Sequence, residues 1–195
     1  MLIVDFQFMV YNIKDYLFDY FNTLHLSMNV FVLMLRQDDP SKCTAAKLIK
    51  FHLINSTTFI PKNTIVLNAF SNMVLSKDDL NNGKSLCAID CSWNYIHETL
   101  NKFKIIKKRI NRRLPLLLAG NPVNYAKLGK LTTAEALAGS LYILGYQSRA
   151  EELLNKFRWG HTFLELNLEI LKSYSEKQNP EQIKKIEKEY FPNVY

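Results

Sequence analysis

Short apolar runs, each the length of a buried strand, alternate with stretches of helical spacing from Met28 onward, and this alternation constrains the fold most. The runs predicted to be strands are Val30–Leu35, Ile65–Leu67, Leu86–Ile89 and Leu114–Ala119. Apolar residues at helical spacing predict a helix over Ser41–Ile54, and a further helix is predicted over Asn94–Phe103. Strands come early and helices late, so the fold class is α/β with a helical C-terminal half.

Four helix starts are predicted in the C-terminal third. Three of them have Ser or Thr followed three residues later by Glu, the capping-box spacing: Thr132–Glu135, Ser148–Glu151 and Thr162–Glu165. Gly145 and Gly160 stand where the first two of these helices should end, and Asn179-Pro180 begins the fourth. In that last helix, lysines alternate with Glu187 and Glu189, which is typical of a solvated helix.

The charge is unevenly spread along the 195 residues, which together carry a formal +7. Residues 1–27 contain three aspartates and one lysine, a net of −2, so the rest of the chain carries +9. We expect Met28 to be the natural start and residues 1–27 to be an extra, non-native extension; a genuine amphipathic helix is the alternative. No apolar run reaches the length of about 18 residues that a membrane span needs, so no membrane association is expected.

Three cysteines, Cys43, Cys87 and Cys91, are too few and odd in number for a disulfide framework, which favours a reducing, cytoplasmic compartment. Cys87 and Cys91 have no second ligand pair at zinc spacing, so no metal is expected. The sequence also lacks a Gly-x-Gly-x-x-Gly motif and a Walker loop.

A basic segment spans residues 101–113. It holds seven cations and no acid: Lys102, Lys104, Lys107, Lys108, Arg109, Arg112 and Arg113. Interleaved Phe103, Ile105, Ile106 and Ile110 allow one side to pack while the cations face outward. Such a patch offers phosphate contacts without base specificity, although a solvated face beside a strand is an equally ordinary interpretation.

Asp90-Cys91-Ser92-Trp93 follows the predicted strand Leu86–Ile89. A carboxylate, a hydroxyl and an indole at the carboxyl end of a strand occupy the usual ligand position of an open α/β sheet. The alternative is that Asp90 caps the next helix and Trp93 fills the core. Further along, Thr132 and Thr133 open a helix whose N-terminus favours a carboxylate.

Taken in order, several of these motifs resemble the small-subunit ribosomal RNA aminocarboxypropyltransferases. The matching motifs are Asp38-Asp39-Pro40-Ser41-Lys42-Cys43-Thr44, Asp90-Cys91-Ser92-Trp93, Arg113-Leu114-Pro115, Ala119-Gly120-Asn121-Pro122-Val123-Asn124-Tyr125, Lys130-Leu131-Thr132-Thr133-Ala134-Glu135-Ala136 and Phe157-Arg158-Trp159-Gly160. The resemblance runs from Met28 to about Ser173 and excludes residues 1–27.

The resemblance implies an enzyme that moves the 3-amino-3-carboxypropyl group of S-adenosylmethionine to N3 of a uridine or pseudouridine in small-subunit rRNA. It also implies a small N-terminal α/β part, residues 28–92, and a C-terminal cofactor-binding part, residues 93–195, with a trefoil knot near Leu114–Tyr125. The expected partner is rRNA or a pre-ribosomal particle, and the expected state is a monomer. A knotted RNA methyltransferase and a non-catalytic ribosome-assembly factor are the alternatives.

The resemblance also assigns roles to individual residues. Cofactor contacts fall on Thr44, Leu67, Ile89, Trp93, Leu114, Gly129 and Thr133. Thr44 and Thr133 would bind the amino acid end and Trp93 the sulfonium, while Asp90 would either take the N3 proton or order the amino group. The expected RNA contacts are Lys104, Lys107, Lys108, Arg109 and Arg112.

The chain departs from the family pattern in two places. Asn68-Ala69 replaces an Asp-Pro beside the adenine wall. Ala126-Lys127-Leu128-Gly129 replaces a Gly-Arg-Pro-aromatic run, which leaves Gly129 only its backbone to offer the ribose. These changes affect the expected packing of the cofactor and leave the implied reaction unchanged.

Overall fold

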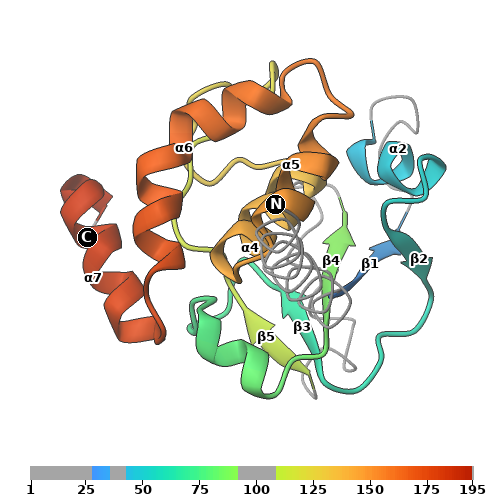
Figure 1. Cartoon of the computed structure of the whole chain (residues 1–195), viewed down its shortest axis with the longest axis horizontal. Coiled ribbons are helices and arrows are strands. Elements are labelled where there is room, and N and C mark those ends of the chain that lie inside the picture. The colour runs from blue at the N-terminus through green and yellow to red at the C-terminus, as the bar shows by residue number, and fades with distance from the viewer. Residues whose placement is uncertain (1–27, 36–42, 92–108, 195) are drawn as a thin grey trace, which may run out of the picture.

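The computed structural model describes residues 28–35, 43–91 and 109–194, which form a parallel β-sheet with helices packed against it (Figure 1). The strands in chain order are β1 Asn29–Met34, β2 Asn55–Thr57, β3 Thr64–Leu67, β4 Ser85–Asp90 and β5 Ile110–Arg112. Their order across the sheet is β2-β1-β4-β3-β5, and all pairings are parallel. The sheet confirms the α/β class, because parallel neighbours require crossovers of the kind the alternating runs predict.

The helices follow mainly in the second half of the chain. Their bounds are α2 Thr44–Lys50, α4 Thr133–Ile143, α5 Gln147–Leu154, α6 Gly160–Ser175 and α7 Pro180–Tyr190, with short 3-10 turns η1 Lys77–Asn81 and η3 Pro192–Val194. In Figure 1, α6 and α7 stand side by side at the end of the molecule opposite β2. Among the described residues, no helix is both long and apolar enough to cross a membrane.

The two faces of the sheet pack into different clusters. On β1, Val30 and Val32 belong to the main hydrophobic core, to which the helices of the second half also contribute. Leu33 on the same strand joins a smaller cluster with Val66 and Cys87. This alternation is the period of two expected for strands whose two faces are both covered.

Two predicted helix starts are confirmed. Before α4, the Thr132 hydroxyl accepts from the Glu135 N–H, and the Glu135 carboxylate accepts from the Thr132 N–H at 2.7 Å. Before α7, Asn179 caps the helix and Pro180 is its first residue. Gly145 ends α4 as expected, with a φ of +96° that favours glycine.

The starts predicted at Ser148–Glu151 and Thr162–Glu165 are wrong, because α5 begins at Gln147 and α6 at Gly160. Gly160 therefore opens a helix instead of ending one. A Cβ at Gly160 would lie 2.0 Å from the Leu154 carbonyl oxygen, so close packing between α5 and α6 requires the glycine. The spacing of capping residues in the sequence carries no information about such a contact between two helices.

The predicted strand over Leu114–Ala119 is wrong. Leu117 and Ala119 are buried at strand-like alternation, but the segment joins no strand of the sheet. Side chains of α6 and α7 bind its backbone instead: the Asn167 amide bonds both the N–H and the carbonyl of Leu118, each at 2.8 Å. The alternating burial that the sequence predicts is therefore present, but the backbone bonds to helix side chains where a strand would bond to a neighbouring strand.

Near the start of the chain, α2 is shorter than the predicted helix Ser41–Ile54 and ends at Lys50. The backbone turns at His52, where φ is +56°, and leads into β2. β2 and β5 have no apolar run of their own, so the sequence patterns missed both. The helix predicted over Asn94–Phe103 lies outside the described residues.

Candidate active site

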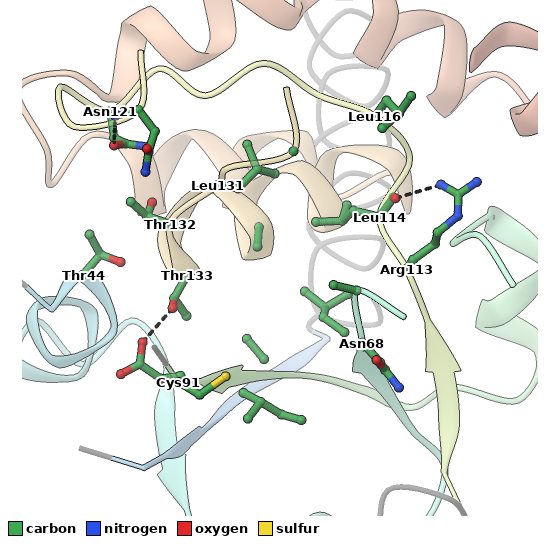
Figure 2. Close-up of a pocket in the computed structure, with 18 of the residues that line it drawn as sticks. Thr44, Asn68, Cys91, Arg113, Leu114, Leu116, Asn121, Leu131, Thr132 and Thr133 are labelled. Atoms are coloured by element: carbon green, nitrogen blue, oxygen red, sulfur yellow. Dashed lines mark hydrogen bonds between the residues drawn. The ribbon is translucent and has the colours of Figure 1, made fainter. Parts of the chain in front are cut away.

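A cavity of about 860 Å³ opens at the carboxyl ends of β3 and β4 (Figure 2). It is lined by Cys43, Thr44, Leu67, Asn68, Ala69, Ala88, Ile89, Asp90, Cys91, Arg113, Leu114, Pro115, Leu116, Asn121, Val123, Asn124, Gly129, Leu131, Thr132, Thr133, Ala136 and Val194. The start of α2, with Cys43 and Thr44, lies on one side, and the segment between β5 and α4 closes the other. Open parallel sheets bind their ligands at this edge.

Six of the seven predicted cofactor residues line this cavity: Thr44, Leu67, Ile89, Leu114, Gly129 and Thr133. The seventh, Trp93, lies outside the described residues. Gly129 has a φ of +71° and open space where a Cβ would stand, so its backbone is accessible to a ligand. The structure therefore brings together residues separated by almost ninety positions in the chain.

Asp90, at the end of β4, joins the two sides of the cavity. The Thr133 hydroxyl, at the start of α4, donates to Asp90 Oδ1 at 2.7 Å. The Cys43 thiol, which precedes α2, donates to Oδ2 at 3.2 Å. These two hydrogen bonds fix the orientation of the Asp90 carboxylate in the cavity wall.

The N-termini of α2 and α4 also meet directly. The Thr44 hydroxyl accepts from the Ala134 N–H at 3.2 Å. Since a hydroxyl carries one proton and two lone pairs, Thr44 keeps its proton for another acceptor. The Thr133 proton, in contrast, is already given to Asp90, so its remaining capacity is to accept.

The thiol of Cys43 is kept protonated. Its pKa is raised to about 11, chiefly by burial and also by the hydrogen bond and negative charge of Asp90, against the lowering effect of the Ala46 N–H. A thiolate would be the reactive form, so Cys43 acts here as a hydrogen-bond donor and not as a nucleophile.

Glu135 fastens the far wall of the cavity to α4. Its side chain is fully buried, and its carboxylate accepts from the N–H groups of Gly120 and Asn121 at 2.7 and 2.9 Å, and from the Asn121 amide at 2.8 Å. It also accepts from the N–H and hydroxyl of Thr132 at 2.7 and 2.9 Å. The turn at Asn121 and the start of α4 are therefore held by one carboxylate.

The comparisons with known proteins agree with this geometry. A family model described as "Ribosome biogenesis protein, C-terminal" matches residues 65–191. A 16S rRNA aminocarboxypropyltransferase from Thermoplasma volcanium is 45% identical over 165 residues, which cover 83% of this chain and 98% of the relative. One from Saccharolobus islandicus is 42% identical over 171 residues, covering 86% and 98%.

The solved structure of the SAM-dependent rRNA:acp-transferase Tsr3 from Vulcanisaeta distributa has a TM-score of 0.73 to this chain at 33% identity. The match covers 83% of this chain and 96% of that one. The chain belongs to the 16S rRNA aminocarboxypropyltransferase family. The resemblance expected from the ordered motifs is thereby confirmed, and so is the Tsr3-like α/β architecture.

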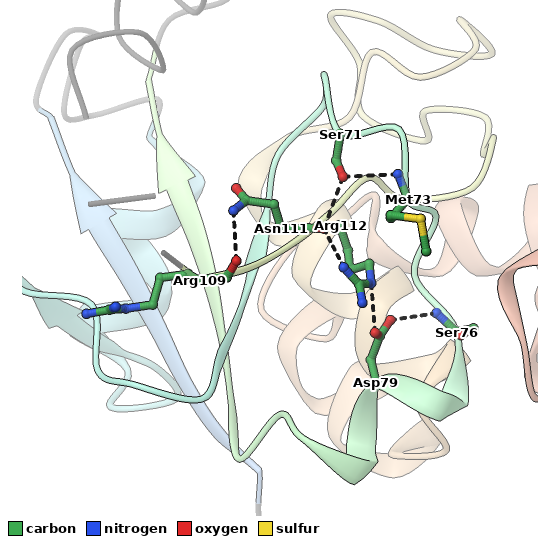
Figure 3. Close-up of polar contacts among 7 residues, drawn as sticks. All are labelled: Ser71, Met73, Ser76, Asp79, Arg109, Asn111 and Arg112. Atoms are coloured by element: carbon green, nitrogen blue, oxygen red, sulfur yellow. Dashed lines mark hydrogen bonds and ion pairs between the residues drawn. The ribbon is translucent and has the colours of Figure 1, made fainter. Parts of the chain in front are cut away.

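Two members of the predicted RNA-binding set are partly engaged in the fold (Figure 3). The Arg112 guanidinium pairs with Asp79 Oδ1 at 2.7 Å, and Arg109 donates to the Ile60 carbonyl at 2.8 Å while lying over the Phe59 ring. Burial raises the pKa of Asp79, against the opposing Ser76 N–H and Arg112 charge. The other three, Lys104, Lys107 and Lys108, lie outside the described residues.

The sequence patterns missed Glu187 altogether. The alternation of charges predicted a solvated position, yet Glu187 is fully buried. It receives both terminal nitrogens of Arg113 at 2.7 Å and the Leu116 N–H at 2.8 Å. The sequence held one signal for this pair. The basic segment that ends at Arg113 contains no acid, so a buried Arg113 needs a carboxylate from another part of the chain.

Proposed function

We propose that this protein transfers the 3-amino-3-carboxypropyl group of S-adenosylmethionine to N3 of a uridine or pseudouridine in 16S rRNA. The observation that carries the proposal is the convergence of Thr44, Asp90 and Thr133 on one cavity, next to an apolar wall that includes Leu67 and Leu114. The family matches supply the reaction class. The acceptor is free rRNA or a pre-ribosomal particle.

The residues present fit the donor. A cavity of about 860 Å³ is of the size that small-molecule sites have. Its apolar side chains, Leu67, Ile89 and Leu114, suit an adenine ring. Its polar end offers hydroxyl groups and a carboxylate, which suit an amino acid's two charged groups.

The hydrogen bonds already made at the polar end support different binding residues for the two charged groups. Thr44 has a proton left to donate, so it suits the donor's carboxylate. Thr133 and Asp90 have lone pairs left to accept, so they suit the ammonium group. We therefore assign Asp90 to ordering the amino group.

When bound, S-adenosylmethionine supplies an electrophilic γ-carbon: the N3–Cγ bond forms, the Cγ–S bond breaks with its electron pair going to sulfur, and the N3 proton is released. The protein's part is orientation, because a sulfonium is already a good leaving group. Trp93 is assigned to the sulfonium, where an indole face gains roughly 0.5–2 kcal/mol from a cation.

Two variants test these assignments. Asp90→Asn should weaken S-adenosylmethionine binding in calorimetry, since the ammonium loses its charged partner. If binding were unchanged and the rate constant at saturation fell instead, Asp90 would be the base for N3. Trp93→Ala should also weaken donor binding, and an unchanged affinity would place the sulfonium elsewhere.

Transfer itself is tested with labelled donor and unmodified 16S rRNA. Donor labelled at the carboxyl carbon should label the RNA and release 5′-methylthioadenosine. Label arriving only from the methyl group, with S-adenosylhomocysteine as product, would indicate a methyltransferase. No donor binding at all would indicate a non-catalytic assembly factor.

We further propose that Lys104, Lys107, Lys108, Arg109 and Arg112 form the RNA surface. Replacing Lys107 and Lys108 by alanine should weaken RNA binding and flatten its dependence on salt, because fewer counterions are released from phosphate. An unchanged salt slope would move the RNA surface to another face.

We also infer a trefoil knot near Leu114–Tyr125, within a cofactor-binding part that spans residues 93–195 beside the 28–92 part. The enclosure of Leu116 and Leu118 by side chains of α6 and α7 supports this inference. If the termini are linked covalently, the denatured chain should keep the knot and be more compact in small-angle scattering than an unknotted circular chain of equal length.

A further inference from the structure

The loop between Ala119 and Gly129, which contributes Val123 to the cavity lining, exposes two large side chains. Val123 is 82% exposed, the highest value among the exposed large hydrophobic residues in the described part of the chain, and it also lines the cavity. Tyr125, two residues later, is 57% exposed. Val123 combines this exposure with a place in the cavity lining, which makes the loop a candidate contact for a ligand that enters from solvent.

The loop that carries these side chains is held rigidly. Asn121 Oδ1 accepts from the Asn124 N–H at 3.0 Å, and the Asn124 carbonyl accepts from the Lys127 N–H at 2.9 Å. At its base, Ala119 exchanges hydrogen bonds with Ala126 and Lys127 at 2.7 and 3.1 Å. The Asn121 amide is in turn bound to Glu135. Val123 and Tyr125 are therefore presented on a fixed backbone, which leaves little ordering for a ligand to impose.

The reaction needs a surface of this kind. N3 lies on the pairing edge of the base, so a nucleotide inside a stacked RNA cannot bring it to a γ-carbon within a cavity. The nucleotide must leave the stack, and proteins compensate an extruded base with aromatic or apolar side chains. Val123 reaches from the cavity to solvent, which is the path that such a base would take.

We propose that Tyr125 and Val123 form a stacking platform for the extruded acceptor pyrimidine of the RNA. The proposal rests on the proposed transfer to rRNA and adds the residues that receive the acceptor base. Tyr125 offers its ring to the face of the base, and Val123 fills the space between the base and the cavity wall. The platform carries no charge, so it acts on the base and not on the phosphate backbone.

The test compares two RNA hairpins. The nucleotide that receives label from wild-type protein is mapped first, and a hairpin containing it is matched with a twin that is abasic at that position. At one fixed salt concentration, wild-type protein should bind the intact hairpin about 10-fold or more tightly than the twin. Tyr125→Ala should abolish most of this preference, Val123→Ser should reduce it, and Tyr125→Phe should keep it.

Tyr190→Ala is the matched control, because Tyr190 is also an exposed tyrosine, at 48%, but lies on α7 and not on the loop that carries Val123. It should keep the wild-type preference. The Tyr125 variants and the control should bind S-adenosylmethionine with wild-type affinity in calorimetry. If Tyr125→Ala keeps the full preference while wild-type protein transfers label, the platform proposal is wrong and the proposed function still stands. If wild-type protein transfers no label, the proposed function itself is overturned.

Discussion

Glu135 is the residue on which the geometry of the cavity depends most directly. A fully buried carboxylate is costly unless hydrogen bonds replace its hydration, and Glu135 is surrounded by N–H and O–H donors from Gly120, Asn121 and Thr132. These donors belong to a turn and a helix start that both line the cavity. One side chain therefore couples local capping to the shape of the site.

Glu135→Gln should lower the free energy of unfolding by about 2–4 kcal/mol, because an amide nitrogen would face donors that now bind Oε2. Urea denaturation measures this loss, and calorimetry should show weaker S-adenosylmethionine binding. Glu152→Gln is the control: Glu152 is 47% exposed and its pair with Arg149 lies at the surface, so stability should change by less than about 1 kcal/mol. Equal losses in both variants would contradict the assigned role of Glu135.

Cys43 gives a prediction with a defined pH window. Its pKa is raised from 9.0 to about 11, chiefly by burial. The stability linked to this thiol is therefore fully present below pH 9 and is lost as pH rises from about 9 toward 11. Alkylation by iodoacetamide, followed by mass spectrometry of the Cys43 peptide, should be slow at pH 8 and rise with a midpoint near 11.

Asp90→Asn should move that alkylation midpoint to lower pH, because the charge and hydrogen bond of Asp90 both favour the protonated thiol. The shift should be partial, since burial is the largest cause. A midpoint unaffected by the substitution would mean that the Cys43–Asp90 hydrogen bond is absent in solution.

At the scale of elements, the segment Leu114–Ala119 has the apolar sequence of a strand, but its backbone bonds to side chains and not to a neighbouring strand of the sheet. Pro115 lacks an N–H, and the neighbouring backbone groups bind to side chains of α6 and α7. Tyr174 donates to the Leu116 carbonyl at 3.2 Å in the same way. The helices thus take the place of an adjacent strand on one side, while Leu117 and Ala119 bond to the backbone of residues 126–129 and Leu114, Pro115 and Leu116 line the cavity.

Asn167→Ala should lower the free energy of unfolding by about 2–3 kcal/mol, because the half-buried N–H and carbonyl of Leu118 both lose the hydrogen bond to Asn167. Hydrogen exchange over residues 114–120 should accelerate more than exchange in the sheet. Asn155→Ala, at an exposed position after α5, is the control and should leave both measurements nearly unchanged. Uniform acceleration over the whole chain would show that the segment has no local dependence on Asn167.

At the scale of the whole molecule, the Arg113–Glu187 pair joins the end of the sheet to the last helix. Glu187 is fully buried, and the Arg113 side chain is 22% exposed. Arg113 also lines the cavity, so the docking of α7 and the wall of the site share one interaction. The C-terminal helix is in this sense part of the site although it carries no predicted ligand contact.

Glu187→Ala should lower the free energy of unfolding by about 2–4 kcal/mol, because it leaves a largely buried guanidinium without its carboxylate. Hydrogen exchange in α7 should rise at the same time. Glu189→Ala, on the exposed face of the same helix, should cost less than about 0.5 kcal/mol. If both variants lost the same stability, the burial of Glu187 would be wrong.

The sequence by itself determined the α/β class, most of the strands, the starts of α4 and α7, and six of the residues that line the cavity. Apolar runs and capping residues act over a few positions, so the strands and helix starts that they form can be predicted from short stretches of sequence. Thr44, Leu114 and Thr133 were identified from the ordered motifs of the family, which mark the residues of a site but do not give its geometry. The patterns failed at Leu114–Ala119 and at Glu187, where the deciding partner lies about fifty to seventy residues away.

Only the tertiary structure decided those partners. A buried backbone or carboxylate must be satisfied, but the sequence does not state by which distant group. The side chains of Asn167, Tyr174 and Glu187 replace a strand beside Leu114–Ala119 because α6 and α7 pack there, and packing depends on the whole core. The basic segment 101–113 likewise suggested a surface for phosphate, and only the fold shows that Arg112 and Arg113 at its end also pair with buried carboxylates.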